Sequence, residues 1–333
     1  MSFSIGYGPI TVQSAQDDIR SPAELWSEGL EYARLAESLG FDSVWVGEHH
    51  FTTDGYLPAV FPFLAAIAAS TERVTLGSKV LLAPLHHPVR IAEDAAAVQL
   101  ISKGRLVIGA AIGYRPEEFD GFGVRLSERA RRLERMVEVC RAAWSGASIS
   151  IDGEVPESVT VYPVVGEIPI WLGGRAPAAL ARAGRLADGY IAPVGTIDDL
   201  LGQVEAVDAS SVEADRAERV NVASSSFVVV RSPETDGDRT REALDRLLGF
   251  YQQHKAGDLR SRVGRSTDSD PMVIDGPPAE VVRRLRRFKD ALPDSREHHH
   301  IVRLEFPGMT FEQVTRHMSA FAHDVLPALR RAS

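Results

Sequence analysis

The chain has 333 residues, of which 44% are hydrophobic and 25% are charged, a composition typical of a globular protein with a large core. The formal net charge is −9 and the sequence pI is near 5.6. No basic block stands out, so neither nucleic acid nor an anionic membrane is an expected partner. The single cysteine, Cys140, excludes an internal disulfide framework.

The sequence also predicts where the protein works. Its N-terminus lacks the basic and then apolar signature of a signal peptide. No uninterrupted apolar run reaches the ~20 residues that span a bilayer. We therefore expect a soluble, cytoplasmic protein in a reducing compartment.

Short apolar runs alternate with helical patterns along the whole chain. The first helix shows a clear start signal, because Ser21 can cap it, Pro22 occupies its first position and Glu24 completes a capping box. Thr310 and Gln313 form the same pattern before the last helix. The other helices are expected at 61–70, 88–101, 127–146 (capped by Ser127), 176–186, 197–207 and 239–253. The strands are expected at 3–7, 43–46, 74–82, 105–111, 168–172, 190–192, 221–231 and 301–306.

Eight such alternations favour an α/β fold of the (β/α)8 TIM barrel type, with an open doubly wound sheet as the alternative. Two segments interrupt the pattern. Residues 147–165 contain a possible hairpin around Asp152 and Gly153, and residues 254–278 form a polar stretch of a length typical of lids. Because no domain boundary is visible, the sequence predicts a single domain over 1–333 with these two insertions.

Polar side chains follow the second expected strand. Glu48, His49 and His50 come directly after it, at the strand end where α/β folds place their chemistry. Successive side chains of an extended segment point to opposite faces, so at most one of the two histidines should face a central pocket. The alternative interpretation places both on the surface.

A glycine-rich turn follows the fifth expected strand. Gly173, Gly174, Arg175 and Ala176 precede a helix that starts near Pro177. Glycines permit close backbone approach, a helix N-terminus offers N–H groups, and arginine adds positive charge, so this turn is a candidate phosphate site. An ordinary tight turn with a surface arginine is the alternative.

The remaining histidine clusters indicate structural or surface positions. His86 and His87 precede a proline in a loop, and residues 298–300 are a histidine triplet for which we expect surface exposure. A metal hydrolase would need a His-x-His pair on one strand face, which adjacent histidines do not supply, so we predict no metal site. Neither a Gly-x-Gly-x-x-Gly motif after a strand nor a P-loop is present, so no built-in nucleotide domain is expected.

Three blocks of this sequence resemble the bacterial luciferase-like flavin monooxygenases. The first is Gly-Phe-Asp-Ser-Val-Trp at 40–45, followed by Glu-His-His-Phe at 48–51. The second runs from Val-Thr-Leu-Gly-Ser-Lys-Val-Leu-Leu-Ala-Pro at 74–84 to Phe-Gly at 122–123. The third is Pro-Ile-Trp-Leu-Gly-Gly at 169–174, with Ala-Asp-Gly at 187–189. The order and spacing of the blocks carry the resemblance.

The resemblance implies an FMNH2-dependent monooxygenase of a two-component system. Such an enzyme would receive reduced FMN from a separate flavin reductase and would oxygenate a small organic substrate with O2 through a flavin C4a-peroxide, as a homodimer. The resemblance also assigns residues. His49 aligns with the catalytic histidine, Lys79 and Val80 with a non-proline cis peptide beside the flavin, and the turn at 173–176 with the phosphate site. Glu48, Gly113 and Tyr114 are further candidate cofactor contacts.

This sequence differs from the family pattern at two places, and two alternative functions accompany the assignment. Luciferases carry an arginine where this chain has Ile112, and family members often carry a hydroxyl residue where it has Arg175 and Ala176. An F420-dependent hydride-transfer oxidoreductase of the same superfamily is the nearest alternative. A non-catalytic flavin-binding homologue is the second.

Overall fold

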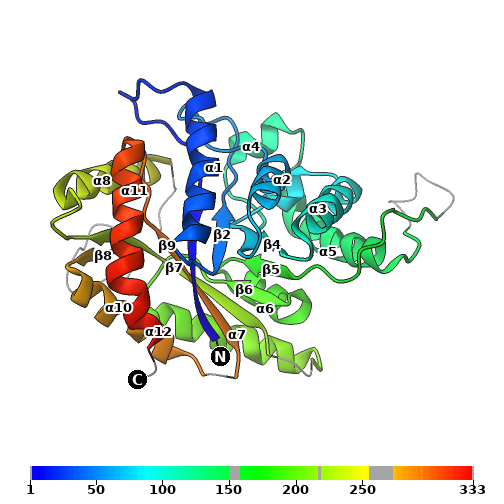
Figure 1. The fold of residues 1–333 in the computed structure, drawn as a ribbon. Coiled ribbons are helices and arrows are strands. Elements are labelled where there is room, and N and C mark those ends of the chain that lie inside the picture. Colours follow the sequence, from blue (N-terminus) through cyan, green and yellow to red (C-terminus); the bar gives the residue numbers. More distant parts are fainter. Residues whose placement is uncertain (1, 150–157, 217–218, 255–272, 294, 332–333) are drawn as a thin grey trace.

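A closed barrel of parallel strands forms the centre of the protein (Figure 1). The computed structural model describes residues 2–149, 158–216, 219–254, 273–293 and 295–331. Within these residues, the barrel order is β1-β2-β3-β4-β5-β6-β7-β9, and β9 closes it by pairing with β1. A further strand, β8, pairs with the C-terminal half of β7. The strands are β1 (Ser2–Ile10), β2 (Ser43–Val46), β3 (Thr75–Ser78), β4 (Leu106–Ala110), β5 (Ile170–Gly173), β6 (Gly189–Ile191), β7 (Asn221–Val230), β8 (Val273–Gly276) and β9 (Glu297–Arg303).

The helices surround the barrel and connect its strands (Figure 1). This (β/α)8 TIM barrel confirms the predicted fold, with all described strands joined in one sheet. The α-helices are α1 (Pro22–Ser38), α2 (Val60–Ser70), α3 (Pro88–Ser102), α4 (Pro116–Gly121), α5 (Arg129–Ser145), α6 (Pro177–Leu186), α7 (Ile197–Glu213), α8 (Gly237–His254), α10 (Pro278–Ala291), α11 (Phe311–Ala320) and α12 (Leu326–Arg330). Short 3-10 turns at Ala83–Leu85 and Leu126–Glu128 and a π-helical turn at Phe321–Val325 complete the regular structure.

Local sequence signals set the start of several helices. The Ser21 side chain accepts from the Glu24 amide while the Glu24 carboxylate accepts from the Ser21 amide, so the predicted capping box opens α1. The same reciprocal bonds form between Thr310 and Gln313 at α11. A cap of this kind stabilises a helix by roughly 1 kcal/mol.

Aromatic and branched side chains fill the inside of the barrel. Trp45 and Trp171 lie with ring centroids 5.8 Å apart, and the same buried cluster includes Ile191 and Ile301, with Val80 packed against it. Since these side chains come from strands around the barrel, the interior is a packed core and not a pore. Within the barrel, room for a ligand therefore lies above this layer, where the strands end.

Several predicted boundaries are wrong. The strand expected at 74–82 ends at Ser78, and the chain then turns through Ala83–Leu85. The last barrel strand begins at Glu297, four residues before the expected 301–306. Ser127 does not cap α5, which follows Glu128 without a side-chain cap. The sequence interpretation also missed α4, β8 and α10, because α4 is short and the other two follow an insertion that masked their pattern.

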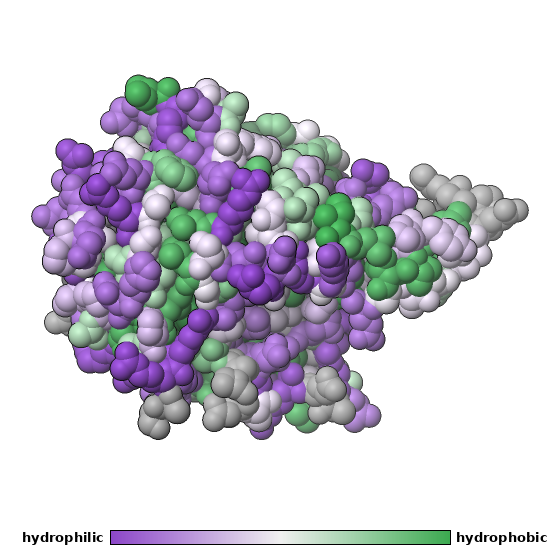
Figure 2. All heavy atoms as spheres, viewed as in Figure 1, coloured by the Kyte–Doolittle hydropathy of each residue, from purple (hydrophilic) through white to green (hydrophobic). Residues whose placement is uncertain are grey.

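The two insertions are only partly described. Ile149 and Val159 pair in an antiparallel bridge, while the expected hairpin tip at Asp152 and Gly153 lies outside the described residues. The exposed side chains of Tyr162 and Val164 follow the bridge, on the segment that projects to the right in Figure 2. Most of the lid predicted at 254–278 also lies outside the described residues, but its last part forms β8. No helix of the described chain is both long and apolar enough to cross a lipid bilayer.

Candidate functional site

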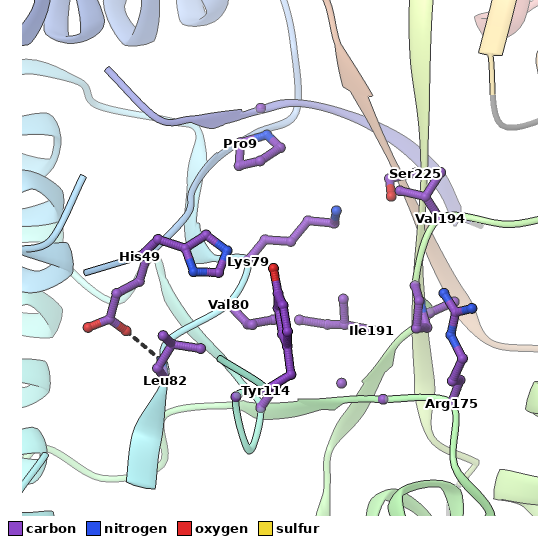
Figure 3. A pocket seen from close by; sticks show the side chains of 18 of the residues that line it. Pro9, His49, Lys79, Val80, Leu82, Tyr114, Arg175, Ile191, Val194 and Ser225 are labelled. Carbon is purple, nitrogen blue, oxygen red and sulfur yellow. Dashed lines mark hydrogen bonds between the residues drawn. The ribbon is translucent and has the colours of Figure 1, made fainter. Parts of the chain in front are cut away.

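A cavity of about 450 Å³ lies at the C-terminal ends of the barrel strands, within the range of small-molecule and cofactor sites. Figure 3 shows His49 and Lys79 on one side of it, Arg175, Val194 and Ser225 on the other, and the Tyr114 ring between them. The lining residues are Gly8, Pro9, Glu48, His49, Tyr56, Lys79, Val80, Leu82, Ala111, Ile112, Gly113, Tyr114, Gly173, Gly174, Arg175, Ile191, Ala192, Pro193, Val194, Ser225, Ser226, Phe227 and Arg303.

A carboxylate holds the His49 ring in place. The Nδ1 of His49 lies 2.8 Å from Oε1 of Glu118, which is buried on α4. The same oxygen accepts from the His50 amide at 3.0 Å and lies 3.4 Å from the Arg115 guanidinium. Because a carboxylate accepts here, Nδ1 must carry the proton, and Nε2 remains as the basic ring nitrogen.

Aromatic rings fix the orientation of His49 from two further directions. Tyr56 meets it edge-on with ring centroids 4.8 Å apart, and Tyr114 does so at 5.8 Å. His49 lines the cavity and His50 does not. The expectation that at most one of the two histidines faces the pocket is therefore confirmed.

Glu48 turns away from His49 and binds the other two histidines of this region. Its Oε1 lies 2.9 Å from Nε2 of His50 and 2.6 Å from Nε2 of His86, and its Oε2 accepts from the Leu82 amide (dashed line in Figure 3). Burial alone would raise the pKa of Glu48, but the bonds from both histidines lower that pKa to about 2. Burial by itself would lower the pKa of His86, but the bond to Glu48 outweighs burial and raises that pKa.

The segment after β3 forms the wall beside His49. Its Lys79–Val80 peptide bond is cis, as the resemblance implied, and both residues line the cavity. The amide of Lys79 donates to the Val46 carbonyl at 2.6 Å, and that of Leu81 donates to Gly109 at 2.7 Å. These bonds tie the wall to the neighbouring strands β2 and β4.

The glycine-rich turn forms the opposite wall. Gly173, Gly174 and Arg175 line the cavity, and Ala176 does not line it but stands at the N-cap of α6. Gly174 has φ +145°, and a Cβ there would lie 2.7 Å from the Ala179 Cβ, so glycine is required. The carbonyl of Gly174 accepts from the Tyr190 hydroxyl at 2.7 Å. The turn thus places the Arg175 side chain at the cavity, two residues before α6 begins at Pro177.

Sequence reasoning missed several residues at the site. Ser225, Ser226 and Phe227 reach the cavity from β7, and Arg303 reaches it from the end of β9. These residues lie on strands near the C-terminal end of the chain, where no recognisable motif marks them in the sequence. Glu118 was missed as well, although a carboxylate shortly after the strand expected at 105–111 was a usable signal.

The histidine triplet lies away from the cavity, and the prediction of a surface location is wrong for two of its members. His298 and His300 are buried and share the Ser224 hydroxyl, at 2.7 and 2.8 Å. The His300 ring packs against Phe288 of α10 at 4.5 Å. Burial lowers the pKa of His298 to about 3 and that of His300 well below its usual value.

A closed (β/α)8 barrel with a cavity of this size at the carboxyl ends of its strands is the architecture of a barrel enzyme. Residues 8–295 match the family described as luciferase-like monooxygenase. The chain belongs to this family of oxidoreductases, which confirms the resemblance found in the sequence.

Named relatives extend the comparison. An F420-dependent glucose-6-phosphate dehydrogenase of Nakamurella multipartita is 29% identical, over 91% of this chain and 93% of its own length. The crystal structure of the monooxygenase RslO1 from Streptomyces bottropensis superposes with a TM-score of 0.79 at 23% identity, covering 98% of this chain and 99% of that one. An F420-dependent secondary alcohol dehydrogenase in complex with an F420-acetone adduct gives 0.76 at 18% identity, covering 99% and 100%. The structural matches support the fold.

Proposed function

We propose that the protein is an F420-dependent oxidoreductase that transfers a hydride between the deazaflavin and a small substrate bearing a hydroxyl or carbonyl group. Relatives named F420-dependent glucose-6-phosphate dehydrogenase align with this chain over nine tenths or more of its length. These alignments favour the alternative named from the sequence over the FMN-dependent monooxygenase. The observation that carries the chemistry is the hydrogen bond between His49 and Glu118 at the cavity wall.

The residues present fit a cofactor of this kind. A deazaflavin is flat and carries an anionic phosphate-bearing tail. The cavity is mainly apolar around Val80, Ile191 and Val194, and Arg175 lines it shortly before α6 begins. Gly173 and Gly174 line the cavity without a side chain, which leaves their backbone open to a phosphate. We assign the tail to this turn and the ring system to the space between Val80 and Tyr114.

His49 supplies the proton chemistry in this proposal. When bound, the deazaflavin accepts or donates a hydride at carbon, and the protein must manage the accompanying proton. Nε2 of His49 takes the hydroxyl proton as the substrate C–H bond gives up its hydride, and returns the proton in the reverse direction. The Glu118 carboxylate fixes the tautomer of the ring and stabilises the imidazolium that forms.

A second function retains one specific observation in its favour. The run Glu48, His49, His50 and Phe51 resembles the luciferase branch of the family. A monooxygenase on this chain would use reduced FMN from a separate reductase together with O2, and His49 would again handle a proton. This candidate assigns the same turn at 173–176 to the FMN phosphate.

Anaerobic titration separates the two candidates. The purified protein is titrated with F420 and with reduced FMN, and each complex is then mixed with alcohols, sugar phosphates or oxygen. Micromolar binding of F420 and alcohol-dependent reduction of the bound cofactor support the proposal. Binding of reduced FMN alone, with oxygenation of an added substrate, would replace it with the second candidate.

A further inference from the structure

One cluster of metal-ligating side chains stands beside the cavity and takes no part in the proton chemistry of His49. Glu48 and His50 are separated by one residue on an extended segment, so their side chains fall on the same face, and His86 joins them from the turn before α3. His49, between the two, points the other way toward Glu118. The sequence interpretation rejected a metal because it looked for a His-x-His pair, whereas the structure presents Glu-x-His together with a remote histidine.

We propose that Glu48, His50 and His86 form a binding site for a divalent transition metal ion, and that Zn2+ is the ion it fits best. One carboxylate oxygen and two imidazole nitrogens converge, all within 4.8 Å of one another. Two histidines and one glutamate are a known three-ligand set for zinc, with a water or other small ligand in the fourth position. Ca2+ and Mg2+ are excluded by this set because they require oxygen ligands.

The distances in the cluster are close to those of a coordinated ion. A Zn2+ ion with bonds of about 2.0–2.1 Å in tetrahedral geometry separates its ligand atoms by about 3.3 Å. Oxygen Oε1 of Glu48 lies 2.9 Å from His50 Nε2 and 2.6 Å from His86 Nε2. The Glu48 oxygen must therefore separate by about 0.4 Å from the His50 nitrogen and by about 0.7 Å from the His86 nitrogen to admit the ion. The larger movement falls on His86, whose side chain is 29% exposed and lies on the solvent side.

The surroundings of the cluster favour a bound cation. The Leu82 amide donates to the second oxygen of Glu48 and so orients the carboxylate, as outer partners of metal ligands do. The Phe122 ring lies edge-on to His50 at 4.7 Å and tilted toward His86 at 6.4 Å, so an aromatic ring packs against one side of the cluster. Because Glu48 also lines the cavity, an ion here would fix the cavity wall next to the reacting groups without touching His49.

Metal titration of the protein without an affinity tag tests this proposal directly. The protein is stripped with a chelator, and Zn2+ binding is followed by calorimetry in the absence of cofactor and substrate, so the result does not depend on the proposed function. We expect one Zn2+ per chain, and a weakening of more than about 100-fold in His86→Gln, because the loss of even an outer partner of a metal ligand costs 10–100-fold. The matched control is His87→Gln, since His87 is the exposed neighbouring histidine outside the cluster; it should bind like the unaltered protein.

The outcomes that overturn the proposal are equally definite. They are the absence of saturable Zn2+ binding, equal binding by His86→Gln, and equal weakening in both variants. Should His86→Gln fail to fold, Co2+ substitution of the unaltered protein decides. Intense visible bands of four- or five-coordinate Co2+ that are displaced by Zn2+ support the site, and a spectrum like that of aqueous Co2+ overturns it.

Discussion

Two sets of histidines in this barrel show how surroundings assign opposite roles to one residue type. At the carboxyl ends of β2 and β3, His49 and His86 each contact a buried carboxylate. Around the early part of β9, His298 and His300 share the neutral hydroxyl of Ser224. A carboxylate partner favours the imidazolium, whereas burial without one favours neutral imidazole. In the first set, the bond to Glu48 raises the pKa of His86, and the second set is part of the core.

His317 extends the second set and makes the contrast sharper. Its Nδ1 donates to the Leu304 carbonyl at 2.8 Å, and its Nε2 accepts from the Val230 amide at 2.9 Å. Both ring nitrogens are thus satisfied only in the neutral form. Burial lowers the pKa of His317 to about 4. Histidines of this kind belong to the packed core, whereas our proposal gives His49, beside the cavity, a role in activity.

The largest expected effect is on turnover in His49→Ala. Removing a positioned acid or base typically costs about 10²–10⁴-fold in rate. We expect this loss in kcat, with cofactor affinity within a few-fold of the unaltered protein, measured by steady-state kinetics and by cofactor titration. His87→Ala, at an exposed position away from the cavity, is the control. Full activity of His49→Ala would contradict the proposed role of His49 in proton transfer, and with it the functional distinction between the two sets of histidines.

The next effect is on stability at low pH and belongs to His317. Its folded pKa of about 4 lies below the unfolded value of 6.5, so the unfolded chain binds more protons between these two pH values. Stability is fully present above about pH 6.5 and falls as the pH drops toward 4, by about 3 kcal/mol at most. Urea unfolding at a series of pH values measures this slope. In His317→Gln the slope should flatten, and an unchanged slope would assign the acid sensitivity to other groups.

A smaller effect on rate is expected for Glu118→Gln. The amide keeps nearly the shape of the carboxylate but removes the charge that stabilises the imidazolium of His49. Outer partners that orient metal-bound histidines are typically worth about 10–100-fold, and we assign Glu118 an effect of the same size. We expect kcat to fall by this factor with little change in KM. If cofactor binding were lost instead, Glu118 would have to be reassigned to the fold of α4.

The smallest effect concerns the opposite wall of the cavity and tests whether that wall acts in binding rather than in proton transfer. In Gly174→Leu the side chain would meet Ala179 and require φ +145°, which displaces the turn. We expect cofactor affinity to fall about tenfold or more, close to 1.4 kcal/mol, with the pH dependence of turnover unchanged. Gly202→Leu is the matched control, because a side chain at this position of α7 meets nothing within 4 Å. Equal affinity in both variants would contradict the phosphate assignment.

The sequence by itself determined the features that depend on near neighbours along the chain. Alternating apolar periods gave eight strand and helix pairs, and the capping boxes at Ser21 and Thr310 located two helix starts. The polar residues after β2 and the glycines after β5 marked two sides of the cavity, because chain order in a parallel barrel places every strand end at the same face. Alternation along an extended segment correctly separated His49 from His50.

Only the tertiary structure decided which distant groups meet. The partner of His49 lies 69 positions away in sequence, and His86 reaches Glu48 across 38. No periodicity encodes such pairs, since they depend on how strands and loops assemble around the barrel. The same holds for the triplet at 298–300, which is polar in sequence, yet His298 and His300 are buried. They are buried because β9 begins before its apolar residues and because α10 covers that face. Local patterns fix the order of the elements, and the charge and burial of a site arise only when the barrel closes.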